Sequence, residues 1–308
     1  MVLVDGHVHV HECFDVARVF DAAAANFAAA ARALAAERDS ASVGNCSRQP
    51  LPALPYRGHP CPRLHCSTAG LHARVPAYDA VLCLVECRGQ QFLDSVRARR
   101  TGRVWRGGHG FWEAEHGCEP ETLVVRRGST QLMLIAGRQL VTRERLEVLA
   151  LGTTAPLQDG EPIEATLAAV RDTGAAAVLP WGVGKWLGAR GAVVARVLSD
   201  PEWEHVLLGD NGNRLELGPD PAPFAAARRA GRAVLPGSDP LPLAGEEARV
   251  GAYGFAVDVA LDPLRPAAAL LALLKSGSAF VVFGRREPLA RFVGNQLALK
   301  LKTRSRRH

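Results

Sequence analysis

Four side chains of metal-binding type recur at every second position near the start of the chain: Asp5, His7, His9 and His11. In an extended strand, alternate side chains point to the same face, so these four are expected to project together. Imidazole nitrogen and carboxylate oxygen are ligands that suit zinc, manganese and iron. The pattern therefore predicts a divalent-metal site just after the apolar run that begins the chain. A surface strand with a chance histidine cluster, or the remnant of an expression tag, would show the same spacing without a metal.

Two aspartates follow apolar strands late in the chain. Asp239 lies in a Pro-Gly-Ser-Asp-Pro turn, and Asp210 lies in a Gly-Asp-Asn-Gly turn. Loops that follow parallel strands converge at one end of the sheet, so both carboxylates are expected near the histidines. A helix N-cap or a tight turn would explain these two aspartates equally. The candidate metal ligands are His7, His9 and Asp239, with Glu147 or Asp210 as a fourth.

A glycine-containing stretch, 179–191, holds two cations at the expected start of a helix. Backbone N–H groups at a helix N-terminus, together with Lys185 and Arg190, can bind a phosphate or a carboxylate. These two residues and Trp181 are therefore predicted to bind a small anionic substrate. The stretch is not a Walker P-loop, because tryptophan follows its Gly-Lys pair. A loop that packs two tryptophans is the structural alternative. The candidate catalytic groups are Asp239, His11 and Lys185, the first two as carriers of a proton.

The elements that would position these groups alternate between strands and helices. The strongest helix pattern covers residues 14–37, where high-propensity residues accompany an apolar face. Alternation of this kind predicts parallel strands in an α/β fold, and a closed or nearly closed TIM-like barrel is the arrangement we expect. Further strands are predicted at 79–85, 136–141, 146–152, 176–180, 205–208 and 233–235. Further helices are predicted at 90–100, 162–173, 187–199, 221–230, 263–275 and 287–300, the part after 240 being mainly helical.

Two segments interrupt the alternation. Residues 38–77 are rich in proline and cysteine and are expected to form an irregular insert. A small zinc knot is the alternative there, although its cysteines lack paired Cys-x-x-Cys spacing. Residues 103–151 switch to a period of two between glycine-containing turns, which predicts a run of β-hairpins.

Composition limits the class of protein. The 308 residues suffice for one large domain, and we expect a single domain over 1–308. The net charge of +6 is diffuse apart from a basic tail at 300–308, so a frayed end is expected and nucleic-acid binding is weakly supported. No membrane span and no secretory signal are recognised, and the seven cysteines are irregularly spaced. A cytoplasmic location with reduced thiols is therefore expected.

Two short motifs carry a family resemblance. Asp-Gly-His-Val-His at 5–9 and Gly-Ser-Asp at 237–239 resemble the PHP (polymerase and histidinol phosphatase) domain and, more distantly, the amidohydrolase superfamily. His7, His9 and Asp239 match the family's metal ligands. The resemblance implies a distorted (β/α)7 barrel and a metal-activated water that hydrolyses a phosphoester or a C–N bond.

The chain departs from the family pattern at several positions. Gln139 stands where the family has Glu, Glu147 lies near its His, Trp181 lies near a later His, and Leu241 replaces the closing His. Asp15 also falls one residue late. With fewer ligands than a three-metal cluster needs, the resemblance implies one or two divalent ions, zinc, manganese or iron. The alternative is a catalytically inactive barrel that serves as a binding or regulatory protein.

Overall fold

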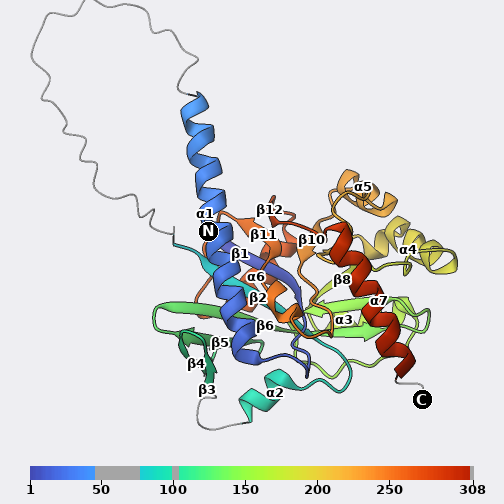
Figure 1. Cartoon of the computed structure of the whole chain (residues 1–308). Coiled ribbons are helices and arrows are strands. Elements are labelled where there is room, and N and C mark those ends of the chain that lie inside the picture. The colour runs from blue at the N-terminus through green and yellow to red at the C-terminus, as the bar shows by residue number, and fades with distance from the viewer. Residues whose placement is uncertain (46–76, 99–103, 306–308) are drawn as a thin grey trace, which may run out of the picture.

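The structure, a computed structural model, describes residues 1–45, 77–98 and 104–305. Strands of one mixed sheet form its centre and helices lie around them (Figure 1). The strands are β1 Val2–Val8, β2 Asp79–Glu86, β3 Val104–Gly107, β4 Gly110–His116, β5 Thr122–Arg127, β6 Thr130–Val141, β7 Glu147–Leu151, β8 Ala176–Pro180, β9 Leu207–Asn211, β10 Val234–Gly237, β11 Tyr253–Val257 and β12 Val281–Gly284. The α-helices are α1 Val16–Asn45, α2 Phe92–Arg97, α3 Ile163–Asp172, α4 Ala189–Ser199, α5 Ala222–Arg229, α6 Pro266–Lys275 and α7 Leu289–Ser305; two 3₁₀ turns, η1 Pro201–Trp203 and η2 Glu246–Arg249, accompany them.

The sheet is shaped like a nearly closed barrel. Its main strand order is β10-β9-β8-β7-β6-β2-β1-β11-β12. The two distant members β10 and β1 meet where the Asp239 amide, just past β10, donates to the His7 carbonyl at 2.8 Å. The α/β barrel-like architecture predicted from the sequence is therefore confirmed in outline.

The barrel is not the regular parallel one that the sequence led us to expect. β1, β2, β6, β8, β9 and β10 run in one direction, whereas β7 and β11 run in the other. The connection from β6 to β7 spans only residues 142–146, too short for the crossover that two parallel neighbours would need. After residue 240, the predicted helices are present as α6 and α7, but β11 and β12, which were not predicted, extend the sheet there.

The hairpin prediction for 103–151 is confirmed. β3, β4, β5 and β6 pair in antiparallel succession, and β6 then pairs with β7. The first predicted helix is longer than expected, because α1 continues through residues 38–45 of the predicted insert. The rest of that insert, 46–76, lies outside the described residues, as do its candidate zinc-knot cysteines. Residues 300–305 of the predicted basic tail belong to α7.

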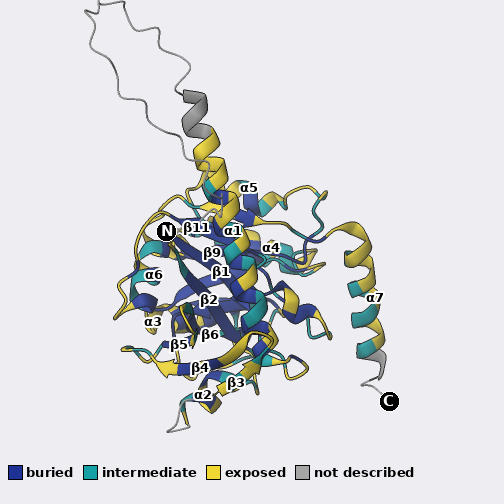
Figure 2. Cartoon of the chain, turned by 60° about the vertical axis from the view of Figure 1, so that its left-hand side comes forward, coloured by how far each residue is buried: buried dark blue, intermediate teal, exposed yellow. Residues whose placement is uncertain are grey.

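Apolar side chains fill both the inside and the outside of the barrel. Val4 of β1, Val81 of β2 and Ile135 of β6 belong to a buried cluster to which most barrel strands contribute. Continuous Val, Leu and Ala runs supply both faces of these strands, as expected of parallel strands covered by helices. Figure 2 shows the buried strands enclosed by helices whose outer faces are exposed. The barrel is thus a packed core, and polar groups are left to its ends.

Helix α1 packs along the outside of the barrel. Phe20 and Phe27 are fully buried on one face, at the spacing of two helical turns. The segment Val16–Ser40 of α1, with mean hydropathy 1.2, is long and apolar enough to cross a membrane by length and composition alone. No such span was recognised from the sequence. The length and apolar composition of α1 are weak evidence of a span, because a helix buried in a protein core meets the same criterion.

Glycine is required where β10 approaches β1. A Cβ atom on Gly237 would lie 2.4 Å from the backbone nitrogen of His7, closer than real Cβ contacts allow. We therefore expect Gly237→Ala to push the two strands apart and to lower the free energy of unfolding by about 1–3 kcal/mol, the usual cost of overpacking. Urea unfolding followed by circular dichroism measures this change.

Gly294→Ala is the matched control. This glycine lies in helix α7 with open space around it, so the added methyl group meets nothing within 4 Å. Alanine at a helix interior is favoured over glycine, and this variant should be unchanged or more stable by up to about 1 kcal/mol. Equal stability of the two variants would show that β10 and β1 do not approach as described.

Candidate metal centre

The candidate site lies at one mouth of the barrel. The parallel strands β1, β6, β9 and β10 all end there, and the reversed strand β7 begins there. Side chains from segments that are far apart in the chain therefore converge at this mouth.

His7, His9 and Asp239 form one compact group, as the sequence predicted. The Nε2 atoms of the two histidines are 3.0 Å apart. The Asp239 Oδ1 atom lies 3.5 Å from Nε2 of His7 and 3.6 Å from Nε2 of His9. Ligand atoms about 2.1 Å from a common ion are about 3.0–3.4 Å apart at octahedral or tetrahedral angles. The spacing of these three atoms therefore fits one shared divalent cation.

Burial keeps the His9 imidazole suited to this role. His7 and His9 are each only 5% exposed. Burial, reinforced by the neighbouring His7 ring, lowers the pKa of His9 to about 3, so its imidazole is neutral near pH 7. Only a neutral imidazole offers a nitrogen lone pair to a metal.

The third ligand is held as a carboxylate. Burial acts to raise the pKa of Asp239, but His7, His9 and Lys185 outweigh it and the net direction is downward. Asp239 therefore offers a negative charge to balance a cation.

The backbone at Asp239 is constrained to aim its side chain. Its φ of 43° is left-handed, an uncommon conformation for a residue with a Cβ. The Nδ2 of Asn211 donates to Asp239 Oδ2 at 2.9 Å, and the Nδ2 of Asn213 donates to its carbonyl. Strained residues of this kind persist where the surroundings fix them and are frequent at functional sites. The Asn211 bond leaves the other oxygen, Oδ1, facing the histidines.

Asp5 serves the backbone and lies outside the group. It is fully buried, and its carboxylate accepts from the amides of Ser238 and Gly251 at 2.8 Å and from that of His7 at 3.3 Å. Burial raises its pKa to about 6. Asp5 thus ties β1 to the segment after β10 and to the start of β11, and so holds the histidine strand against the aspartate turn.

His11 is close to the group but turned away from it. β1 ends at Val8, so His11 lies beyond the strand and outside its alternation of side chains. The His11 ring stacks on His9 with centroids 5.2 Å apart, and its Nε2 lies 2.9 Å from the Pro240 carbonyl. With Nε2 bonded there, His11 supports the His9 ring, and its predicted role as a proton carrier remains a prediction.

Neither predicted fourth ligand lies in the group of three. Glu147, at the start of β7, forms an ion pair with Lys185. Asp210, at the end of β9, is buried and binds both Nε and Nη2 of Arg214, at 2.8 and 2.9 Å, while the Tyr253 hydroxyl donates to it at 2.9 Å. The carboxylate of Asp210 is thus engaged in a structural network.

The predicted substrate-binding residues are placed as follows. Lys185 lies near enough to Asp239 to lower its pKa, but its charge is matched by Glu147. Arg190 donates to the Gly184 carbonyl within its own loop. Trp181 packs against the apolar cluster outside β7–β9, and its carbonyl accepts from Asn211. All three residues are therefore engaged with neighbours in the chain.

Two buried acceptors beside the group, the Oδ1 atoms of Asn211 and Asn213, have no hydrogen-bond partner among the described residues. A buried acceptor without a donor is costly, and an ion or an ordered water is a common explanation. A hydrated cation held by His7, His9 and Asp239 would supply the missing positive charge and donors. The residues present therefore fit a metal.

Asn211 and Asn213 were not predicted to be site residues. Both lie in the polar run Gly-Asp-Asn-Gly-Asn at the end of β9, which reads equally well as a tight turn. Their position after a buried strand was the one feature that could have indicated them. The neighbouring Asp210 shares that position and was predicted as a ligand.

No protein-family model matches the chain, and no curated protein is significantly similar to it. The arrangement of its own residues is therefore the basis for any statement about function.

Proposed function

We propose that the protein is a metal-dependent hydrolase that cleaves a phosphoester or a C–N bond of a small substrate. The observation that carries this proposal is the buried group of His7, His9 and Asp239 at the barrel mouth. Three protein ligands that leave a position open to water are typical of catalytic zinc, whereas structural zinc is usually enclosed by four. The resemblance of 5–9 and 237–239 to PHP domains supports the same chemistry.

The chain's own residues have distinct parts in this proposal. His7 and His9 bind the ion as neutral ligands, and Asp239 balances its charge. When bound, a divalent ion supplies an activated water as nucleophile near neutral pH. Asp239 Oδ2, held by Asn211, is a carboxylate oxygen at the group that would accept a proton. The packed barrel interior below the group excludes bulk water from that side.

Activity should depend on the metal and on Asp239. We expect hydrolysis of p-nitrophenyl phosphate or of a simple anilide when manganese or zinc is added, and loss of that activity with EDTA. Asp239→Asn should reduce the rate by at least about a hundredfold, because it removes both a ligand charge and a proton acceptor. The exposed Asp172→Asn is the control and should leave the rate unchanged.

Protein that takes up no metal and is silent on the whole panel would contradict this proposal. That result would favour a catalytically inactive barrel acting as a binding or regulatory protein, for which the amide of Gln139 in place of a carboxylate is the supporting observation.

A further inference from the structure

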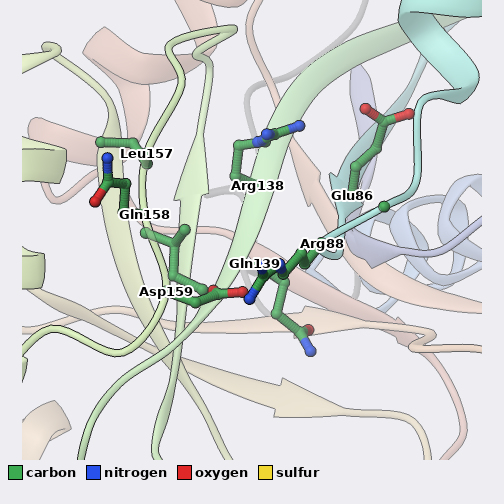
Figure 3. A pocket seen from close by; sticks show the side chains of 9 residues that line it. Glu86, Arg88, Arg138, Gln139, Leu157, Gln158 and Asp159 are labelled. Atoms are coloured by element: carbon green, nitrogen blue, oxygen red, sulfur yellow. The ribbon is translucent and has the colours of Figure 1, made fainter.

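A cavity of about 300 Å³ opens beside the metal group. The end of β2 forms one wall, the segment 157–159 forms another, and β6 passes between them (Figure 3). Gln139 belongs both to this cavity and to the surroundings of His9. The lining consists of Glu86, Arg88, Gly89, Arg138, Gln139, Leu140, Leu157, Gln158 and Asp159.

The two acidic residues of the lining are engaged by backbone amides. The amide of Leu93 donates to Glu86 at 3.0 Å, and that of Val141 donates to Asp159 at 2.9 Å. By contrast, neither Arg88 nor Arg138 has a carboxylate at ion-pair distance within the described part of the chain. Arg138 lies near Glu86 without pairing with it. The cavity therefore presents two guanidinium groups whose fork-like donors are available to a ligand.

On β6, the direction of the side chains separates Arg138 from the metal group. Arg138 and Gln139 are neighbours on β6, and Figure 3 shows them leaving the strand on opposite sides. Gln139 faces the side of His9, so an anion held by Arg138 lies apart from the ion. A substrate bound at both places must carry its anionic group away from the bond that is cleaved.

We infer that this cavity binds the anionic end group of the substrate, a carboxylate or a phosphate, through Arg88 and Arg138. The identification of the anion as part of a substrate rests on the proposed function. The binding of an anion in this cavity does not depend on it. It replaces Lys185 and Arg190 as the main anion-binding residues, since those cations are engaged by Glu147 and by the Gly184 carbonyl.

Anion binding to the metal-free protein tests the inference. Protein treated with EDTA is titrated with inorganic phosphate and, separately, with succinate, and heat is measured by calorimetry. We expect one of the two anions to bind with a stoichiometry near one, and its identity tells phosphate from carboxylate. Arg88→Gln and Arg138→Gln should each weaken that binding by about tenfold or more, as expected for loss of a charge-assisted contact.

Arg143→Gln is the matched control, because Arg143 is an exposed arginine near β6 that does not line the cavity. It changes net charge by the same amount and should leave the affinity unchanged. Equal weakening by all three substitutions, or no binding of either anion at about 10 mM, would overturn the inference. Since no metal is present, failure of the metal-site proposal would not alter this result.

Discussion

Replacing both His7 and His9 by alanine should abolish metal binding while leaving the protein folded. The two imidazoles supply two of the three atoms in the candidate group, at 3.0 Å from each other. Loss of a residue that only supports a metal ligand costs 10–100-fold in affinity, so removing two ligands should cost well over about a hundredfold. Calorimetric titration of zinc into metal-free protein measures the affinity, and circular dichroism checks the fold.

A double variant of two exposed histidines separates this site from incidental binding. His109 and His116 lie in and beside β4, away from the barrel mouth, and both are exposed. His109→Ala with His116→Ala should retain the wild-type stoichiometry and affinity for zinc. Stoichiometric, undiminished zinc binding in the His7 and His9 variant would contradict the assignment of these ligands.

Arg214→Met should be strongly destabilising. Arg214 is 3% exposed and binds both oxygens of Asp210, which is 5% exposed. Removing one partner of a buried ion pair leaves the other charge without compensation and typically costs about 3–5 kcal/mol. Urea unfolding should show that loss. Folded Arg214→Met protein should still bind zinc through the three-residue group.

Arg228→Met is the corresponding surface substitution. Arg228 also pairs with an aspartate, Asp220, but their side chains are 52% and 38% exposed. Exposed pairs contribute about 0–1 kcal/mol, so this variant should be nearly as stable as the wild type. If Arg214→Met cost no more than Arg228→Met, the buried network around Asp210 would not exist as described. Loss of zinc binding from folded Arg214→Met protein would show that the Asp210–Arg214 network also positions the three candidate ligands.

The three candidate metal ligands were the most predictable part of the site. His7 and His9 were indicated by their alternation after an apolar run, and Asp239 by its place in a glycine-serine turn after a second apolar run. His11 could not be placed in the same way, because β1 ends at Val8 and the alternation of side chains does not extend to it. Where a strand ends depends on its pairing with neighbouring strands and not on the local pattern alone.

Asp210 and Asp239 show why a carboxylate at the end of a strand is ambiguous. Both follow short apolar strands and both are in turns rich in small or polar residues. Their roles differ because Arg214 folds back onto Asp210, while Asn211 turns Asp239 toward the histidines. These contacts join residues within loops whose conformation no periodic pattern specifies.

The architecture was predictable only in part. Helix α1 and the alternating elements from 160 to 237 carried strong periodic signals, and most of them are present in the structure. β11 was missed because its pairing partner, β1, lies about 250 positions away in the chain. By contrast, the antiparallel pairing of β7 with β6 falls within the hairpin run predicted for 103–151.

The most direct test of the metal centre is X-ray diffraction from zinc-loaded crystals at the zinc absorption edge. We expect one strong anomalous peak about 2.0–2.2 Å from the Nε2 atoms of His7 and His9 and from Oδ1 of Asp239. A zinc peak located elsewhere, or no peak between these three side chains in crystals grown with excess zinc, would contradict it.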